Sequence, residues 1–394
     1  MYTVSRQMNN TPKVAWLLPV TWFYWQPTLS KFTQLFPKTQ IFTALWPGYA
    51  QGFEDTLKVE VLGEFKVLKT PEKRRKYGTH FKGMSLTFTQ LPLNIVSHLL
   101  EAKPDIVFTS SFGVWTLAAA LLKVIGRWKL VVAYEGSSPR ADRLDSAPHT
   151  LLRKAVVSSA DAFITNSRTG QQYLTNFLNA DAKRVFVFPY EIPAAESLLV
   201  SQDDTPVIPP DEQRPIFLFV GRLMPRKGVH TLLEACTLLK RRGYDGQFTV
   251  LVVGDGEERE SLEAISQENQ LERCVKWLGR VDYEQISCYF RQSDVFVLPT
   301  LEDTWGVVVL EAMLMGKPVL CSTGAGSSEM ITQGKNGYVF TPEQPEQLAD
   351  IMEKFIESPE LAQKMGNCSQ EIMARCTPES ASQNLAKVVT SLTR

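Results

Sequence analysis

Short apolar runs alternate with longer amphipathic segments along the whole chain. In the first half, runs rich in β-branched residues predict strands at 14–20, 105–110, 129–134, 162–166 and 185–189. In the second half, the predicted strands are 216–221, 248–254, 275–279, 295–299 and 318–322. Segments of helical period fill the intervals, and near-continuous apolar strands separated by helices are typical of a parallel sheet covered on both faces. Because the pattern occurs twice, we expect an α/β chain with two doubly wound domains.

The predicted domain boundary lies in SQDDTPVIPPDEQRP (201–215), which is polar and contains four prolines. Such a composition is typical of a linker. We therefore expect a first domain at 1–200 and a second at 201–377, followed by a segment with helical apolar spacing at 378–394. Ligands of open α/β sheets bind outside the carboxyl ends of the strands, so two sheets facing each other would form a cleft.

The composition indicates an ordinary globular protein. Of 394 residues, 44% are hydrophobic and 21% charged, which excludes a disordered chain, a collagen and a disulfide-rich scaffold. All six cysteines lie in the second half without CxxC spacing, which favours a reducing, cytoplasmic setting. The four histidines lack metal-site spacing, and no apolar run approaches the roughly 20 residues of a transmembrane helix.

The formal charge of zero hides an asymmetry between the halves. Residues 1–200 carry 23 Lys and Arg against 14 Asp and Glu, a net of +9, so the remainder carries −9. Either the halves meet different partners, or opposite charges face each other across the cleft.

A single acid, Glu311, interrupts the apolar helix predicted for VVVLEAMLM. A carboxylate buried there needs either a ligand or a nearby backbone donor, and the sequence leaves both open. The preceding loop, LEDTWG, ends in Gly306 and turns into this helix. The first amides of a helix have no partner within it and suit phosphate oxygens or sugar hydroxyls.

Two cations follow the first predicted strand of the second half. In GRLMPRKG, Arg222 and Lys227 lie at the carboxyl end of that strand, where they suit a diphosphate and neutralise charge on a leaving group. The segment VGDGEE brings Gly254 to the same sheet edge. It is neither GxGxxG nor a P-loop, which argues against NAD and ATP sites of those kinds.

Five segments in fixed order resemble the donor-binding half of GT-B glycosyltransferases of family 4. They are GRLMPRKG, VVGDGEE, LGRV, SDVFVLPTLEDTWGVVVLEAMLMGKPVL and NGYVF, within residues 214–345. The resemblance implies two Rossmann-like domains with the active site between them. It also implies transfer of a sugar from a nucleotide donor with retention of configuration, and a C-terminal helix that returns to the first domain.

By position, the resemblance implies that Arg222 and Lys227 hold the donor diphosphate and that Glu311 binds the ribose. Glu311 is then the second acid of an E-x7-E motif, and Asp303 is the first. No metal or other cofactor is required, because the cations stabilise the leaving phosphate. The remaining candidate donor contacts, mostly backbone groups, are Gly221, Gly254, Gly279, Arg280, Val281, Thr304, Trp305, Gly306 and Val307.

Three features depart from the family pattern. The first acid is Asp303 rather than Glu, although Glu302 beside it offers a substitute. The segment 19–30 replaces the usual Gly-Gly loop, and Tyr134 and Glu135 follow the strand at 129–134 where a histidine is common. Glu135 therefore joins Arg222, Lys227 and Asp303 as a candidate catalytic residue that orients or deprotonates the acceptor; the alternative is an ordinary loop acid.

The first half should hold the acceptor information. It contains six of the eight tryptophans, including Trp22 and Trp25 in WFYWQP, and a basic run at 66–83 with seven Lys or Arg against one Glu. Aromatic and basic surface suits an anionic bilayer or sugar rings, so we expect a lipid-linked or glycan acceptor and peripheral contact with the inner membrane face. A solvated basic loop with buried aromatics is the alternative. Tyr134, Glu135, Trp22 and Trp25 are the candidate acceptor-side residues, and no motif indicates nucleic acid.

The sequence therefore favours a retaining hexosyltransferase of cell-envelope polysaccharide or glycolipid synthesis, with a UDP-sugar as the donor that the family uses most. Two other functions remain open. One is a nucleotide-sugar epimerase, and the other is a nucleotide-binding protein of this fold without transfer activity.

Overall fold

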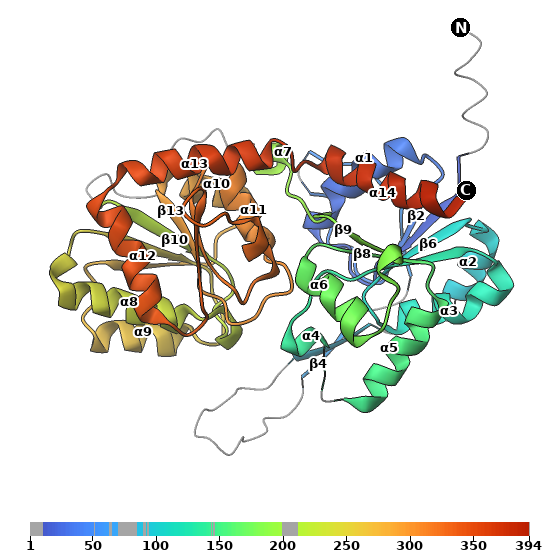
Figure 1. Cartoon of the computed structure of the whole chain (residues 1–394), viewed down its shortest axis with the longest axis horizontal. Helices are drawn as coiled ribbons and strands as arrows, with labels where there is room; N and C mark the ends of the chain where they lie inside the picture. The colour runs from blue at the N-terminus through green and yellow to red at the C-terminus, as the bar shows by residue number, and fades with distance from the viewer. Residues whose placement is uncertain are drawn as a thin grey trace, which may run out of the picture. The chain divides into compact units, whose positions relative to one another are not determined.

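The computed structural model describes residues 11–50, 52–62, 65–69, 85–89, 92, 94–142, 144, 146–198 and 212–393. The chain divides into two compact units, each α/β (Figure 1). Unit 1 comprises 1–135, 143–191 and 378–394, and unit 2 comprises 136–142 and 192–377. Most of the predicted linker, up to residue 211, lies outside the described residues.

Unit 1 is built on a seven-stranded parallel sheet in the order β3-β2-β1-β6-β7-β8-β9. The strands are β1 (Val14–Leu17), β2 (Gln40–Thr43), β3 (Val59–Val61), β6 (Ile106–Ser110), β7 (Lys129–Ala133), β8 (Ala162–Thr165) and β9 (Val185–Val187). A separate antiparallel pair joins β4 (Phe65–Lys69) to β5 (Ser85–Thr89). The basic run at 66–83 begins in β4, and residues 70–84 lie outside the described part of the chain.

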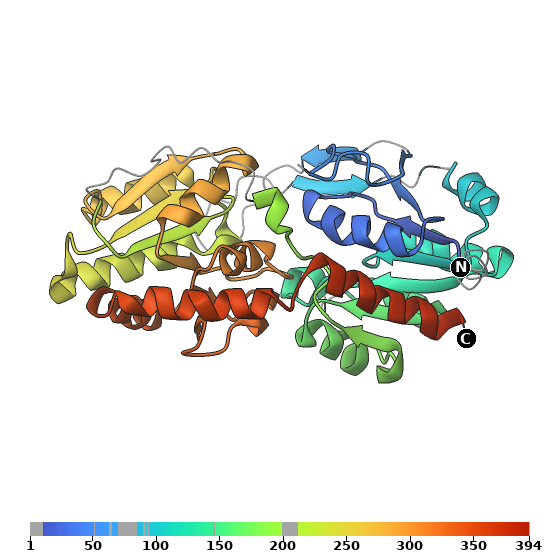
Figure 2. The same cartoon turned by 90° about the horizontal axis from the view of Figure 1, so that it is seen from above.

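Helices cover both faces of this sheet, because alternate strand residues point to opposite sides. The helices are α1 (Gln26–Leu35), α2 (Ile95–Ala102), α3 (Val114–Gly126), α5 (Ala147–Ser159), α6 (Arg168–Gln172) and α14 (Pro378–Thr393). One face packs α1 and α14 around Trp16 and Phe108, and α14 runs alongside α1 (Figures 1 and 2). The other face packs α2, α3 and α5 around Trp115 and Phe163.

Unit 2 repeats the architecture with six parallel strands in the order β12-β11-β10-β13-β14-β15. The strands are β10 (Ile216–Val220), β11 (Thr249–Val253), β12 (Val275–Gly279), β13 (Val295–Leu298), β14 (Val319–Ser322) and β15 (Gly337–Phe340). The helices are α4 (Pro139–Asp142), α7 (Ala195–Leu198), α8 (Val229–Leu239), α9 (Arg259–Glu268), α10 (Tyr283–Gln292), α11 (Val307–Leu314), α12 (Pro345–Glu357) and α13 (Glu360–Met373).

In both sheets the first strand lies beside the fourth parallel strand of its unit, so the strand order reverses there. This reversal point is where open α/β sheets bind ligands. In unit 2 it lies between β10 and β13, and the loops that follow these two strands therefore define the place to look for a site.

The prediction of a two-domain α/β fold with parallel sheets is confirmed, and each of the ten predicted strands exists. The strands that were not predicted, β2 to β5 and β15, have three to five residues each. Such short segments carry little periodic signal.

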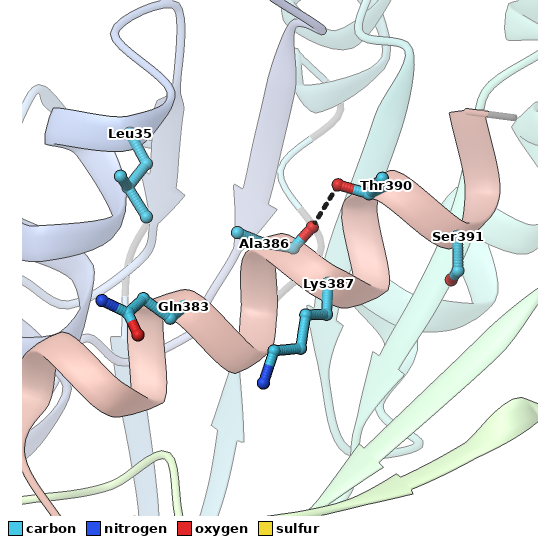
Figure 3. Close-up of a pocket in the computed structure, with 6 residues that line it drawn as sticks. All are labelled: Leu35, Gln383, Ala386, Lys387, Thr390 and Ser391. Carbon is cyan, nitrogen blue, oxygen red and sulfur yellow. Dashed lines mark hydrogen bonds between the residues drawn. The ribbon is translucent and has the colours of Figure 1, made fainter.

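A shallow hollow of about 460 Å³ lies on unit 1 between the end of α1 and one side of α14. Figure 3 shows the six lining residues, Leu35 from α1 and five from α14, where Thr390 donates to the Ala386 carbonyl at 2.8 Å. None of the residues that the sequence singled out lines it. Among the described residues, no helix is long and apolar enough to cross a membrane.

Candidate functional site

The two loops at the reversal point of unit 2 are bound to each other through their backbones. The carbonyl of Arg226, in the loop after β10, accepts hydrogen bonds from the Leu301 amide at 2.7 Å and the Thr300 hydroxyl at 2.7 Å, both in the loop after β13. Gly228 has a φ of +64°, and a side chain there would meet the Pro299 carbonyl at 2.2 Å. The close approach of the loops therefore requires glycine at this position.

A cluster of charge sits where these loops meet. Lys227 Nζ lies 2.5 Å from Asp303 Oδ2, and the two side chains are only 12% and 13% exposed. Arg226 Nη1 lies 3.6 Å from the same oxygen and donates to the Glu302 carbonyl at 3.1 Å. One carboxylate thus faces two cations, which leaves a net positive charge at the carboxyl edge of the sheet. The sequence missed Arg226, because a third basic residue in one loop cannot be distinguished from a solvated one.

Glu302, the possible substitute for the first acid, points elsewhere. Its Oε1 accepts a hydrogen bond from the Ser138 hydroxyl at 2.8 Å. Ser138 belongs to 136–142, the short segment that unit 2 takes from the first half of the chain. The acid that meets the cations is therefore Asp303.

Arg222 lies apart from this cluster. Its side chain is 66% exposed and its Nη2 lies 3.1 Å from Glu257 Oε2, in the loop after β11. Thus the structure joins Lys227 to Asp303 but pairs Arg222 with a different acid. The loops after β10 and β11 still touch closely: Gly254 has a φ of +140°, and a Cβ there would lie 1.9 Å from the Gly221 carbonyl oxygen.

The loop that leads into α11 is fixed by a third segment, 324–327. Asp303 donates through its amide to the Gly324 carbonyl at 2.8 Å, and its own carbonyl accepts from the Gly326 amide at 3.1 Å. The Ser327 amide donates to the Trp305 carbonyl at 2.8 Å. Trp305 itself is buried, and the neighbouring Thr304 backbone lies against Gly326. Gly306 then takes a φ of +89° and starts the helix at Val307.

Glu311 lies on α11, 7% exposed, among apolar residues. Its Oε1 accepts a hydrogen bond from the Tyr283 hydroxyl at 2.9 Å, from the start of α10. Burial raises the pKa of Glu311 to about 7, and the bond from Tyr283 partly opposes that rise. The acid therefore has a hydrogen-bond donor, and both the ligand role and the structural role foreseen for it remain compatible with its contacts. Tyr283 gave no signal in the sequence.

The third strand end at this edge is that of β12. Gly279 has a φ of +73°, and its carbonyl accepts from the Gly254 amide at 2.7 Å. Arg280 follows with an exposed side chain, and Val281 is half-buried. The candidate backbone contacts after β10, β11 and β12 are therefore neighbours in space along one sheet edge.

In unit 1, Asn166 connects two acids at the carboxyl ends of strands. Its amide donates to the Glu135 carbonyl at 3.3 Å, and its Nδ2 donates to Glu191 Oε2 at 3.1 Å. Its Oδ1 accepts from the Tyr190 amide at 2.8 Å. Glu135 is half-buried, while Glu191 is 1% exposed. The sequence missed Glu191 and Asn166, because neither belongs to a recognisable motif.

Two of the candidate acceptor-side aromatics are buried. The Trp25 ring is 1% exposed and packs on Trp16 and Tyr190, with centroids 5.7 and 5.0 Å away. The expectation that Trp25 offers its ring to an acceptor is therefore wrong, because the turn at 23–25 directs it into the core. Tyr134 is 2% exposed and stacks on Tyr173, whereas Trp22 is 42% exposed.

Two family models match the chain. "Glycosyl transferases group 1" matches residues 200–371, and "Glycosyl transferase 4-like domain" matches residues 40–191. The first match holds the whole charge cluster and α11, and the second holds Glu135, Asn166 and Glu191.

Curated relatives match a little under half of the chain. The α-D-kanosaminyltransferase of Streptomyces kanamyceticus is 33% identical over 178 residues, which is 45% of this chain and 46% of that protein. The D-inositol 3-phosphate glycosyltransferase of Corynebacterium urealyticum is 29% identical over 44% of this chain and 42% of its own length. The aligned region thus spans about half the length of these relatives.

Solved structures match over nearly the whole chain. The crystal structure of HepE from Anabaena in complex with UDP superposes with a TM-score of 0.70 at 19% identity, covering 96% of this chain and 100% of that one. HepE in complex with UDP-glucose superposes with a TM-score of 0.67 at 19% identity, covering 96% and 99% of the two chains. At this identity the likeness shows the shared fold.

Proposed function

Because the chain belongs to the GT-B glycosyltransferases of family 4, we propose that it transfers a sugar from a nucleotide-sugar donor to a lipid-linked or glycan acceptor, with retention of configuration. One observation carries the proposal. The nearly buried pair Lys227 and Asp303, with the half-buried Arg226 beside it, forms a charge cluster at the reversal point of the unit 2 sheet, directly before α11 and its buried Glu311.

The donor diphosphate would bind at this cluster. Lys227 and Arg226 offer N–H donors that Asp303 only partly satisfies, and the first amides of α11 add the positive end of a helix. Arg222 is long and exposed, so it can exchange Glu257 for a phosphate without leaving a buried charge unpaired. Glu311 would accept hydrogen bonds from the ribose, and the backbone at 279–281 would contact the base.

A uridine nucleotide is the donor we favour. HepE, which shares the fold, has been crystallised with UDP and with UDP-glucose. We extend that chemistry to this chain because Lys227, Arg226 and Glu311 lie in the segments that follow two neighbouring strands, β10 and β13. There they could hold the diphosphate and the ribose of such a nucleotide.

In the proposed step, an acceptor hydroxyl attacks the anomeric carbon on the face from which the diphosphate leaves. The bond between that carbon and the phosphate oxygen breaks, and the hydroxyl proton passes to the departing phosphate or to a carboxylate such as Glu135. Lys227, Arg226 and Arg222 stabilise the charge that accumulates on the leaving group, which is the largest contribution usually available to such a site. We propose that these cations make a metal unnecessary, so a chelator should leave turnover unchanged.

The experiment that tests the donor site is a thermal-shift panel with UDP, GDP, ADP and their sugars. A ligand at 100 times its dissociation constant stabilises the folded protein by about 2.7 kcal/mol. We expect a shift with the uridine compounds that Lys227→Ala abolishes. Lys335→Ala is the matched control, because Lys335 is exposed and precedes β15, at the opposite edge of the same sheet. No shift with any nucleotide would contradict the proposal.

A second measurement separates transfer from the two alternatives. Radiolabelled UDP-sugar is incubated with the protein, with and without membrane extract, and the products are resolved. Label in an extractable lipid or glycan supports transfer. A changed sugar on an intact nucleotide, formed without any extract, would instead indicate an epimerase, and binding without any product would indicate a nucleotide-binding protein.

A further inference from the structure

Helix α3 is apolar on its outer side as well as on its inner side. Its inner side places Trp115 and Ala119 in the core of unit 1. On the outer side, Leu121, Val124 and Ile125 recur at the three- and four-residue spacing of a helix face, and they are 68%, 83% and 69% exposed. A helix that is apolar all round is normally buried, so this outer side lacks a covering that its composition predicts.

Helix α5 extends the apolar surface. Leu151 and Leu152 are 73% and 41% exposed, although neighbouring Val156 and Val157 point into the same core as α3. Helices α3 and α5 pack against each other, as Figure 1 shows on unit 1. Together with Val114 at the start of α3, these side chains define what we call the α3–α5 face. Several exposed apolar side chains on two packed helices are typical of an interaction site.

The charged side chains on helices α3 and α5 are all basic. Residues 114–130 and 146–160 contain no Asp or Glu. Arg127, Lys129 and Lys154 are exposed at the ends or sides of the two helices. Asp145 and Asp161 flank the second of these ranges in sequence, and Asp161 is engaged by Lys123 at 2.6 Å and by Lys129 at 3.3 Å. An apolar face on helices whose charged residues are all basic is the pattern by which a helix lies in a lipid interface.

We propose that the α3–α5 face docks on an anionic lipid bilayer, with both helices lying in the plane of the interface. The charge argues against a second copy of the chain, because two such faces would bring like charges together. This surface is distinct from the aromatic segment at 22–27 and from the basic run at 66–83. Its biological use rests on the proposed function, since a lipid-linked acceptor would be met at such a surface.

The test is flotation of the full chain with vesicles of phosphatidylcholine alone or with 30% phosphatidylglycerol. We expect binding to the anionic vesicles that weakens with salt. Each cation near an anionic surface strengthens binding roughly fivefold, so Arg127→Glu and Lys154→Glu should each weaken it by at least about that factor. Val124→Ser with Ile125→Ser should weaken it about tenfold or more, because burial of two apolar side chains is lost. The control is Val61→Ser, since Val61 on β3 is 52% exposed and lies outside the face.

Three outcomes would overturn the proposal. The first is no binding to anionic vesicles, and the second is binding that these substitutions leave unchanged. The third is a dimer in sedimentation equilibrium that the Val124 and Ile125 substitutions dissociate, which would make the face a contact between copies. The nucleotide thermal shift of each variant keeps the two proposals apart: lost docking with an intact shift concerns this face alone, and an absent shift with intact docking concerns the donor site alone.

Discussion

Replacement of Glu311 by glutamine should stabilise the nucleotide-free protein increasingly as the pH rises. The substitution keeps the shape of the side chain and an oxygen that accepts the hydrogen bond from Tyr283. It removes only the ability to ionise. Because the carboxyl is buried on α11, the folded protein resists its ionisation and the unfolded chain does not.

The magnitude follows from the pKa. Burial raises the pKa of Glu311 from 4.5 to about 7, so the folded protein holds the proton more tightly than the unfolded chain. Stability therefore falls as the pH rises from about 4.5 to about 7 and is constant above that range. At about 1.4 kcal/mol per pKa unit, the full effect is on the order of 3 kcal/mol, and most of it should develop between pH 5 and pH 8.5.

The assay is equilibrium unfolding in urea at pH 5.0, 7.0 and 8.5, for the wild-type protein and Glu311→Gln without nucleotide. The difference between the two proteins isolates Glu311, because the other titrating groups contribute equally to both. Protection of the α11 amides from hydrogen exchange identifies the transition in which unit 2 unfolds. The substitution also buries the NH2 group of glutamine, which changes stability by the same amount at every pH. This constant offset cancels when the differences at two pH values are compared.

A difference in free energy of unfolding that does not change with pH would refute the reasoning. It would mean that Glu311 ionises in the folded protein as readily as in water. A variant that gains stability toward low pH would refute it as well, since that sign requires a lowered pKa.

Three further substitutions test the geometry of the two units. Lys227→Ala leaves the nearly buried Asp303 carboxylate with only the longer ion pair to Arg226 at 3.6 Å, so thermal unfolding should show a loss of about 3 kcal/mol. Lys227→Met with Asp303→Leu should largely recover this loss, and an unchanged melting temperature of the single variant would contradict the pairing. Gly254→Ala should lower the free energy of unfolding by more than about 3 kcal/mol, because its Cβ would lie 1.9 Å from a backbone oxygen. Gly246→Ala, with a φ of +70° and no atom within 4 Å of its Cβ, should lower it by only about 1 kcal/mol in the same thermal unfolding assay. Asn166→Ala removes a buried side chain that makes three hydrogen bonds, and urea unfolding should show a loss of about 2 kcal/mol or more, a loss that Asn166→Asp should not repair because it brings a second carboxylate to Glu191.

The fold was predictable because parallel strands buried on both faces produce long apolar runs. Strands such as β10 and β11 read as continuous hydrophobic segments, and all five of their residues are buried. The short edge strand β3 is half-exposed and alternates Val with Glu over three residues, too few for a period to emerge. Central strands were therefore predicted from the sequence, and edge strands with little burial were not.

The site was predictable wherever a residue conflicted with its local pattern. Glu311 could be identified from the sequence, because a carboxylate inside an apolar helix is unstable without a partner. Gly254 could be identified because a glycine directly after an apolar strand indicates a tight turn. Partners stay hidden, since Tyr283 and Arg226 are ordinary at their own positions and become significant only through a neighbour 28 or more positions away. The direction of a side chain in an irregular segment is not predictable from the sequence either. No pattern indicated that Trp25 is buried while Trp22 is exposed.

The discontinuity of unit 1 bears on the order in which the chain can fold. Helix α14 places Leu385, Val388 and Val389, all but fully buried, against α1 and the first strands. Unit 2 ends at residue 377, so all of its residues are synthesised before α14. On the ribosome, the unit that begins first must therefore wait for the final helix to close its core, while the unit begun later can finish ahead of it. A chain stopped at residue 377 would expose the apolar side of α1 and become a substrate for proteases and chaperones, although every residue of the proposed donor site would be present.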